Sequence, residues 1–262
     1  MGEPLLICLS RLGFGLQCAS RPPRACAGDN VRVAAADGKI SDRNVTKGRE
    51  RMPQIFLDGA DVEVIVPELR LGGIAGVTTN PEILAGAGIT RESLGEFVLK
   101  ILAAGAQAIF VQSWGLCADE MYRNAVGLQE IDPRIVVKIP WTDEGSRAGR
   151  RLVVYGASVL ATAVFTVEQV ISAQACGVHW IAPYVDSIER TGTPALGVLS
   201  RMSRVTGSAT ILAADVHTPA RLADVLDSGI DAVTVEPEVW FGLNGDPNAL
   251  AAAERFEGFV RP

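Results

Sequence analysis

Short apolar runs alternate with longer amphipathic segments from Met52 onward. Runs rich in Val and Ile are typical of buried parallel strands, and the segments between them have the period of surface helices. The predicted strands are Ile55–Leu57, Ile74–Thr78, Ala108–Gln112, Arg134–Ile139, Val159–Val164, His179–Pro183, Thr210–Ala214 and Ala232–Val235. The predicted helices include Arg91–Ala104, Ala118–Gln129, Asp143–Tyr155, Val167–Ala175, Pro194–Thr206, Pro219–Ser228 and Ala249–Phe259.

This alternation predicts an α/β fold. Eight strands within about 200 residues favour one closed (β/α)8 barrel of the TIM type over an open sheet, and we expect it to span residues 52–262. A dinucleotide-binding fold is disfavoured, because no glycine-rich phosphate loop follows the first strand.

Residues 1–51 lack any sustained period and are predicted to be a disordered extension. A secretory signal is one alternative, since Ala25-Cys26-Ala27 resembles a cleavage site, but Glu3 and Arg11 do not fit such a signal. An upstream start codon, with Met52 as the natural first residue, would explain the segment equally well.

Charge and cysteine content narrow the expected partners and compartment. Residues 1–51 hold nine Lys/Arg and five Asp/Glu, which leaves 15 basic and 25 acidic residues in the rest of the chain. A body with this negative balance should repel nucleic acid and anionic membranes, and no apolar run approaches the ~20 residues of a membrane span. Five cysteines without paired spacing favour reduced thiols in a cytoplasmic protein.

Lys138 is the most unusual polar residue in a predicted strand, because it interrupts the apolar run Ile135–Pro140. A single lysine can extend out of an edge strand to solvent, which is a purely structural explanation. The alternative is functional. In barrels of this type chemistry occurs at the carboxyl ends of the strands, and a desolvated lysine becomes a neutral amine able to attack a carbonyl.

Other polar residues also close predicted strands, and Glu236 follows the last of them. Asn80 precedes Pro81 and Glu82, so it is predicted to cap a helix, which does not exclude a second role at the strand end. Asp61 is expected to cap a turn, leaving Asp58 to point into the barrel mouth. The two histidines, His179 and His217, have no Cys or carboxylate at ligand spacing, so no metal site is expected.

In combination these residues resemble the transaldolase family, and most closely its small fructose-6-phosphate-aldolase-like branch. The resemblance runs from Ile55 to about Trp240. It is carried by Phe56-Leu57-Asp58-x-x-Asp61, Gly76-Val77-Thr78-Thr79-Asn80-Pro81, Gln112, Val136-Val137-Lys138-Ile139-Pro140, Thr142-x-Glu144-Gly145, Thr162-Ala163-Val164 and Ala182-Pro183-Tyr184-Val185.

The resemblance implies a role for each matching residue. Lys138 would form a Schiff base with a ketose donor, and Asp58 would transfer protons where the carbon–carbon bond breaks. Thr78 and Asn80 would hold hydroxyls of a dihydroxyacetone unit. Thr162 and Gln112 would position a catalytic water, and Gln112 and Tyr184 are the aldolase-type residues at two positions that separate the branches. Neither metal nor organic cofactor is implied, and relatives of this type form homo-oligomers.

The chain departs from the family where a substrate phosphate is held. The family uses an arginine, a serine and a basic residue there, and this sequence has Ser187, Asp215 and His217 at those positions. A carboxylate repels a phosphate, so we expect a substrate without a phosphate at this end, or one held differently, with Arg190 as a substitute cation.

The leading hypothesis is therefore a class I aldol enzyme that transfers or releases a dihydroxyacetone-type unit between sugar or aldehyde substrates, in specialised metabolism. The alternatives are an ordinary transaldolase of the pentose phosphate pathway and, in another class, a catalytically silent barrel acting as a binding module. Loss of Lys138 or Asp58 would favour the silent barrel, and both are present.

Overall fold

Parallel pairing joins eight strands into a closed barrel in the computed structural model, which describes residues 53–261. Neighbours pair in chain order, and β1 closes the ring by pairing with β8. The strands are β1 (Gln54–Asp58), β2 (Gly76–Thr78), β3 (Ala108–Gln112), β4 (Ile135–Pro140), β5 (Val159–Val164), β6 (Trp180–Pro183), β7 (Thr210–Ala213) and β8 (Ala232–Val235).

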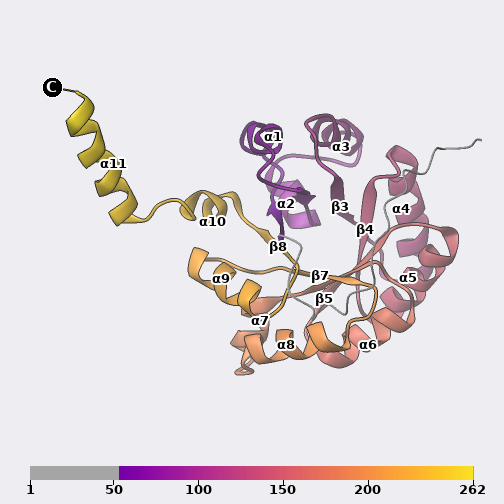
Figure 1. Cartoon of the computed structure of the whole chain (residues 1–262). Coiled ribbons are helices and arrows are strands. Elements are labelled where there is room, and N and C mark those ends of the chain that lie inside the picture. The colour runs from indigo at the N-terminus through magenta and orange to yellow at the C-terminus, as the bar shows by residue number, and fades with distance from the viewer. Residues whose placement is uncertain (1–52, 262) are drawn as a thin grey trace, which may run out of the picture. The chain divides into compact units, whose positions relative to one another are not determined.

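Helices follow the strands and lie outside the barrel (Figure 1). They are α1 (Val62–Leu71), α2 (Pro81–Gly86), α3 (Leu94–Ala103), α4 (Ala118–Ile131), α5 (Asp143–Tyr155), α6 (Val167–Ala175), α7 (Val185–Arg190), α8 (Ala195–Val205), α9 (Pro219–Asp227), α10 (Pro237–Gly242) and α11 (Pro247–Val260). The predicted (β/α)8 barrel is confirmed. The predicted extension, residues 1–51, lies outside the described residues.

Three helices were not predicted from the sequence: α1, α7 and α10. Helix α1 combines a run of β-branched residues, Val62-Glu63-Val64-Ile65-Val66, with Pro67 in its interior, and both features disfavour a helix. Burial of Ile65 and Leu69 and the cap by Asp61 outweigh these local preferences. The other two span six residues each, too short to show a helical period.

The barrel interior is filled by aromatic rings below the level of Lys138. Phe56, Phe110 and Trp180 meet edge to face, with ring centroids 5.2 to 5.9 Å apart. Phe110 is in register with Val136, and Gln112, the next inward position of β3, is in register with Lys138. Lys138 therefore lies above a closed apolar floor rather than at an edge of the sheet.

Helix α5 packs unusually close to the end of β4. A Cβ added at Gly145 would lie 1.8 Å from the backbone oxygen of Pro140, and one at Gly149 would lie 2.7 Å from the Trp141 ring. Only glycine fits at these two contacts, so the strand end that follows Lys138 is held tightly by the helix behind it.

Two properties of the helices concern what they could contact outside the barrel. Among residues 53–261, no helix combines the length and apolarity needed to cross a bilayer. Helix α11 has no buried residue, and Phe256, Phe259 and Val260 are all exposed.

Candidate active site

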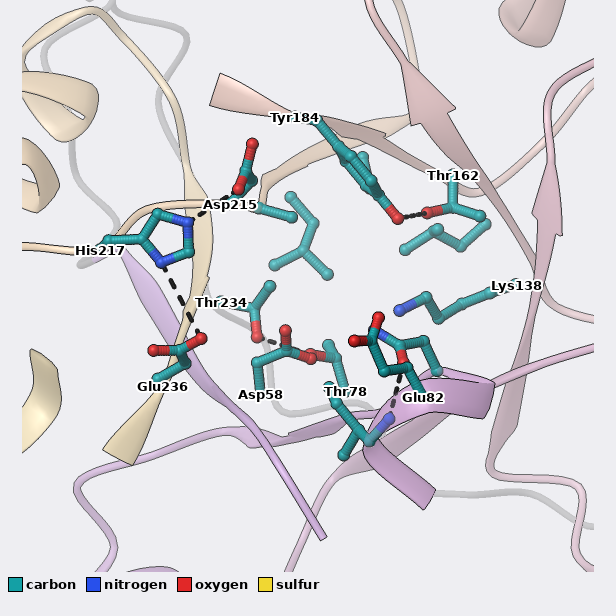
Figure 2. A pocket seen from close by; sticks show the side chains of 16 residues that line it. Asp58, Thr78, Glu82, Lys138, Thr162, Tyr184, Asp215, His217, Thr234 and Glu236 are labelled. Atoms are coloured by element: carbon teal, nitrogen blue, oxygen red, sulfur yellow. Dashed lines mark hydrogen bonds and ion pairs between the residues drawn. The ribbon is translucent and has the colours of Figure 1, made fainter. Parts of the chain in front are cut away.

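A cavity of about 370 Å³ opens at the carboxyl ends of the strands. Polar side chains from every strand or strand end except β3 reach it, as Figure 2 shows. They are Asp58, Thr78, Asn80, Glu82, Lys138, Thr162, Tyr184, Asp215, His217, Thr234 and Glu236. The predicted gathering of polar strand-end residues around one mouth therefore holds for most of the sequence candidates.

Lys138 lies at the bottom of this cavity and is 6% exposed. Its Nζ donates a hydrogen bond of 2.6 Å to the backbone oxygen of Thr79, which is a neutral partner. Burial lowers the pKa of Lys138, and the nearby charge of Asp58 only partly opposes this shift. The lysine is thus held with a larger share of neutral amine than a lysine in water.

Asp58 ends a chain of three side chains at the cavity floor. Its Oδ1 accepts a hydrogen bond of 2.6 Å from the Thr78 hydroxyl, which lies 2.6 Å from the Thr234 hydroxyl. Because the single proton of Thr78 goes to Asp58, Thr234 must be the donor of the second bond. Two buried hydroxyls therefore fix the orientation of the Asp58 carboxylate.

Thr162 and Tyr184 place a pair of hydroxyls on the other side of Lys138 (Figure 2), with their oxygens 3.1 Å apart. The register between β5 and β6 shifts next to Thr162, and Ala163 has a positive φ of 55°. Such an irregularity redirects side chains at a strand end. Burial raises the pKa of Tyr184, and this outweighs the opposite effect of the bond with Thr162, so the phenol stays protonated.

Asn80 caps α2, as predicted, because its side-chain oxygen accepts a bond of 2.9 Å from the Ile83 N–H. Its amide nitrogen keeps its two donors, so the capping role does not prevent contact with a ligand. Glu82, in the first turn of the same helix, also lines the cavity.

The rim beside β6, β7 and β8 is built from charged groups. Asp215 Oδ1 lies 2.8 Å from Nε2 of His217, and Nδ1 of His217 lies 3.8 Å from Glu236. Burial alone would raise the pKa of Asp215, but hydrogen bonds from Ser187 and His217 outweigh it and lower that pKa below the usual value. The carboxylate therefore stays ionised.

The cavity can be divided by exposure. We call Asp58, Thr78, Lys138, Thr162 and Thr234 the inner half, since all but Asp58 are buried and Asp58 is hydrogen-bonded to the buried Thr78. We call Asp215, His217 and Glu236 the outer half, where the side chains of His217 and Glu236 are 46% and 54% exposed.

Three sequence candidates lie outside the cavity lining. Gln112 lines a neighbouring depression that also contains Arg91 and Trp114. Ser187 and Arg190 belong to α7 and reach the outer half only through Asp215, to which Ser187 donates its backbone N–H. A direct contact of these three residues with a ligand in the cavity stays a prediction.

Two polar lining residues were not among the sequence candidates: Glu82 and Thr234. Thr234 interrupts the apolar run of β8 much as Lys138 interrupts that of β4, so the same signal could have found it. Glu82 gave no such signal, because an acidic residue in a first helical turn is ordinary.

His179, unlike His217, lies away from the cavity. His179, at the opposite end of β6 from the cavity, accepts a hydrogen bond from the Val159 N–H through Nδ1, which fits a structural role. Among residues 53–261 no group of three or more His, Cys, Asp or Glu could hold a metal ion.

Comparison with solved structures supports the fold. The chain superposes on thiamine phosphate pyrophosphorylase from Pyrococcus furiosus with a TM-score of 0.50 and 13% identity, covering 70% of this chain and 85% of that one. It superposes on inosine 5′-monophosphate dehydrogenase from Legionella pneumophila with a TM-score of 0.51 and 14% identity, covering 76% and 66%. At such identity these likenesses concern the barrel alone.

Comparison of sequences is more specific. The chain is 30% identical over 207 residues to a protein described as a probable transaldolase from Carboxydothermus hydrogenoformans, covering 78% of this chain and 95% of the relative. Residues 55–257 match the profile of the family described as transaldolase/fructose-6-phosphate aldolase. The cavity with its buried lysine and this match lead to one conclusion: the chain belongs to the transaldolase/fructose-6-phosphate aldolase family.

Proposed function

We propose that this protein is a Schiff-base-forming enzyme that moves a dihydroxyacetone-type unit between ketose and aldehyde substrates. The observation that carries the proposal is Lys138: a lysine 6% exposed, with a lowered pKa, at the floor of a polar cavity. A buried lysine without a paired carboxylate costs stability, and a reactive amine is a reason to retain one.

The chemistry requires two groups, and both are present in the inner half. Lys138 Nζ attacks the ketone carbon of the donor, and loss of water gives a protonated imine. Asp58 then removes the proton from the hydroxyl β to the imine carbon. The carbon–carbon bond breaks, its electrons enter the imine to form an enamine, and an aldehyde leaves.

The enamine has two fates. It attacks a second aldehyde, which completes a transfer, or it takes up a proton and is hydrolysed, which releases the three-carbon unit. The hydroxyl pair of Thr162 and Tyr184 supports a role in holding the water that hydrolysis needs. The part of Gln112 in holding that water stays a prediction, because its side chain lines the neighbouring depression.

The second candidate function is that of an ordinary transaldolase of the pentose phosphate pathway, which differs in favouring transfer over release. The relative described as a probable transaldolase favours transfer, as in ordinary sugar-phosphate metabolism. The altered outer half favours a substrate of specialised metabolism. Cytoplasmic location and assembly into a homo-oligomer also stay predictions.

Turnover of Lys138→Met and Lys100→Met tests the proposal. Both changes remove one lysine, but Lys100 lies on α3 with its side chain 53% exposed. On a panel of ketose donors we expect carbon–carbon cleavage to fall by about 10⁴-fold or more in Lys138→Met and to stay unchanged in Lys100→Met. Full cleavage by a folded Lys138→Met protein would rule out Lys138 as the imine-forming lysine, and no cleavage by the wild type on any donor would favour the silent barrel.

A further inference from the structure

The outer half of the cavity contains an anion that belongs to the protein itself. Asp215 follows β7, its φ is 61°, and its carboxylate lines the cavity facing His217 (Figure 2). Aspartate is among the few residues other than glycine that tolerate this left-handed conformation. The backbone thus turns at Asp215 in a way that brings the carboxylate to the rim.

Three donors converge on that carboxylate. Oδ2 accepts the backbone N–H of Ser187 at 2.6 Å and lies 3.5 Å from the guanidinium of Arg190. Oδ1 lies 2.8 Å from Nε2 of His217. A backbone N–H, a guanidinium and an imidazole are the groups that bind phosphate esters in many proteins, and here a carboxylate already occupies them.

The start of α7 is occupied in the same way. The N–H groups of Val185 and Asp186 donate to the backbone oxygens of Ala214 and Asp215, and the N–H of Ser187 donates to the Asp215 side chain. The first three N–H groups of the helix are therefore all bonded within the chain, and none is left to receive a substrate anion.

Glu236 adds a second negative charge on the other side of His217. Its Oε1 lies 3.8 Å from Nδ1 of His217, so the imidazole stands between two carboxylates. A phosphate dianion brought to His217 would meet like charge on both sides. A hydroxyl would meet carboxylate and imidazole acceptors suited to its proton.

We propose that Asp215 is a resident anion that fills the phosphate position of the cavity and selects substrates whose far end carries a neutral hydroxyl. The inference rests on the proposed function, since it concerns the end of the substrate remote from Lys138. It names a substrate class, unphosphorylated polyhydroxy ketoses and hydroxyaldehydes, and one residue that determines the preference.

Specificity constants for a ketose and for its terminal phosphate ester test the inference. We expect the wild-type enzyme to prefer the unphosphorylated ketose by about tenfold or more. Asp215→Asn keeps an oxygen that can accept the Ser187 N–H but removes the charge, so the ratio should move toward the ester by about tenfold or more. Asp215→Ser is a second variant in case the amide does not fold.

Asp186→Asn is the matched control. Asp186 lies on α7 beside Ser187 and pairs with Arg221, 3.1 Å away, and it is not among the cavity-lining residues. The control removes one carboxylate close to Asp215, and the ratio of specificity constants should stay at the wild-type value. An equal shift in the control would mean that overall charge, not Asp215, sets the preference, and the inference would fall.

Inorganic phosphate provides a readout that needs no turnover. Titration followed by calorimetry should show saturable binding to Asp215→Asn or Asp215→Ser and none to the wild type. If the wild type cleaves ketoses but binds phosphate, or prefers the ester, the inference is wrong while the proposed function stands. If the wild type cleaves neither substrate and both variants still gain phosphate binding, the proposed function fails and the resident anion stands.

Discussion

The two halves of the cavity differ in how they treat charge. In the inner half, Lys138 is buried against the neutral oxygen of Thr79, and burial lowers its pKa. In the outer half, Asp215 is bonded by Ser187 and His217, which keeps it ionised. A site can therefore lower the pKa of a lysine by burying it against a neutral partner and keep a carboxylate ionised by supplying donors, within a cavity of about 370 Å³.

The same contrast separates reaction from recognition. The inner half contains a buried lysine and a carboxylate fixed by two hydroxyls, and in the proposed reaction these serve bond cleavage whatever the substrate carries at its far end. In the same proposal the outer half contacts that far end. Changes in the inner half should therefore lower turnover for all substrates, whereas changes in the outer half should alter the choice between them.

After Lys138→Met, Asp58→Asn should give the largest effect. The amide cannot accept the proton of the substrate hydroxyl, so cleavage should fall by about 10³-fold, while formation of the imine on Lys138 continues. Asp61→Asn is the control from the same loop, since asparagine is as good a helix cap as aspartate. Steady-state cleavage and borohydride trapping separate the two steps. Loss of trapping and cleavage together would show that Asp58 acts on imine formation.

Imine formation should depend on pH through Lys138. Only the neutral amine attacks, so below the pKa the trapping rate should rise about tenfold per pH unit. Because burial lowers that pKa from 10.5, the rate should level off below pH 10.5. A lysine peptide with an ordinary pKa provides the reference. A wild-type profile that matches the peptide would contradict a desolvated amine.

Gly145→Ala should destabilise the support of the inner half. A methyl group there would lie 1.8 Å from the Pro140 backbone oxygen, so β4 or α5 must move, at a cost of about 2 kcal/mol in unfolding free energy. Gly197→Ala is the control: this exposed helical glycine has nothing within 4 Å of the added carbon and should become slightly more stable. Urea denaturation gives the unfolding free energy of each variant. Equal values would mean that β4 and α5 can move apart at Pro140 at little cost.

Thr234→Val should give the smallest effect. It removes the hydroxyl that donates to Thr78, so Asp58 loses its orientation, and kcat should fall by about fivefold to tenfold with little change in KM. Thr234→Ser should restore kcat, because serine supplies the same donor. If valine and serine behave alike, the chain of hydroxyls does not orient Asp58.

Much of this barrel could be predicted from the sequence because its strands are buried on both faces. Runs such as Ile135–Pro140 are almost wholly apolar, so each polar interruption is a candidate functional position. Lys138 was singled out in this way, and the resemblance to a family then favoured a functional role; Thr234 could have been singled out likewise. Helix α1 was missed, since Pro67 and the β-branched run conceal it and only packing of Ile65 and Leu69 reveals it.

The hydrogen bonding within the outer half could not be predicted from the sequence. Asp215 and Ser187 are 28 residues apart, and their hydrogen bond depends on the turn at Asp215 and on where α7 begins. Sequence comparison alone indicated that a carboxylate replaced a phosphate-binding group. It did not indicate that this carboxylate would take up the donors that a phosphate would have used.

Mass-spectrometric mapping of the borohydride-reduced adduct identifies the lysine that forms the imine. The chain has four lysines, Lys39, Lys47, Lys100 and Lys138, so each falls in a separate and assignable peptide. With any ketose donor that the enzyme cleaves, we expect one reduced adduct, on the peptide that contains Lys138. An adduct on another lysine, or cleavage of the donor with no adduct at all, would show that Lys138 is not the imine-forming residue.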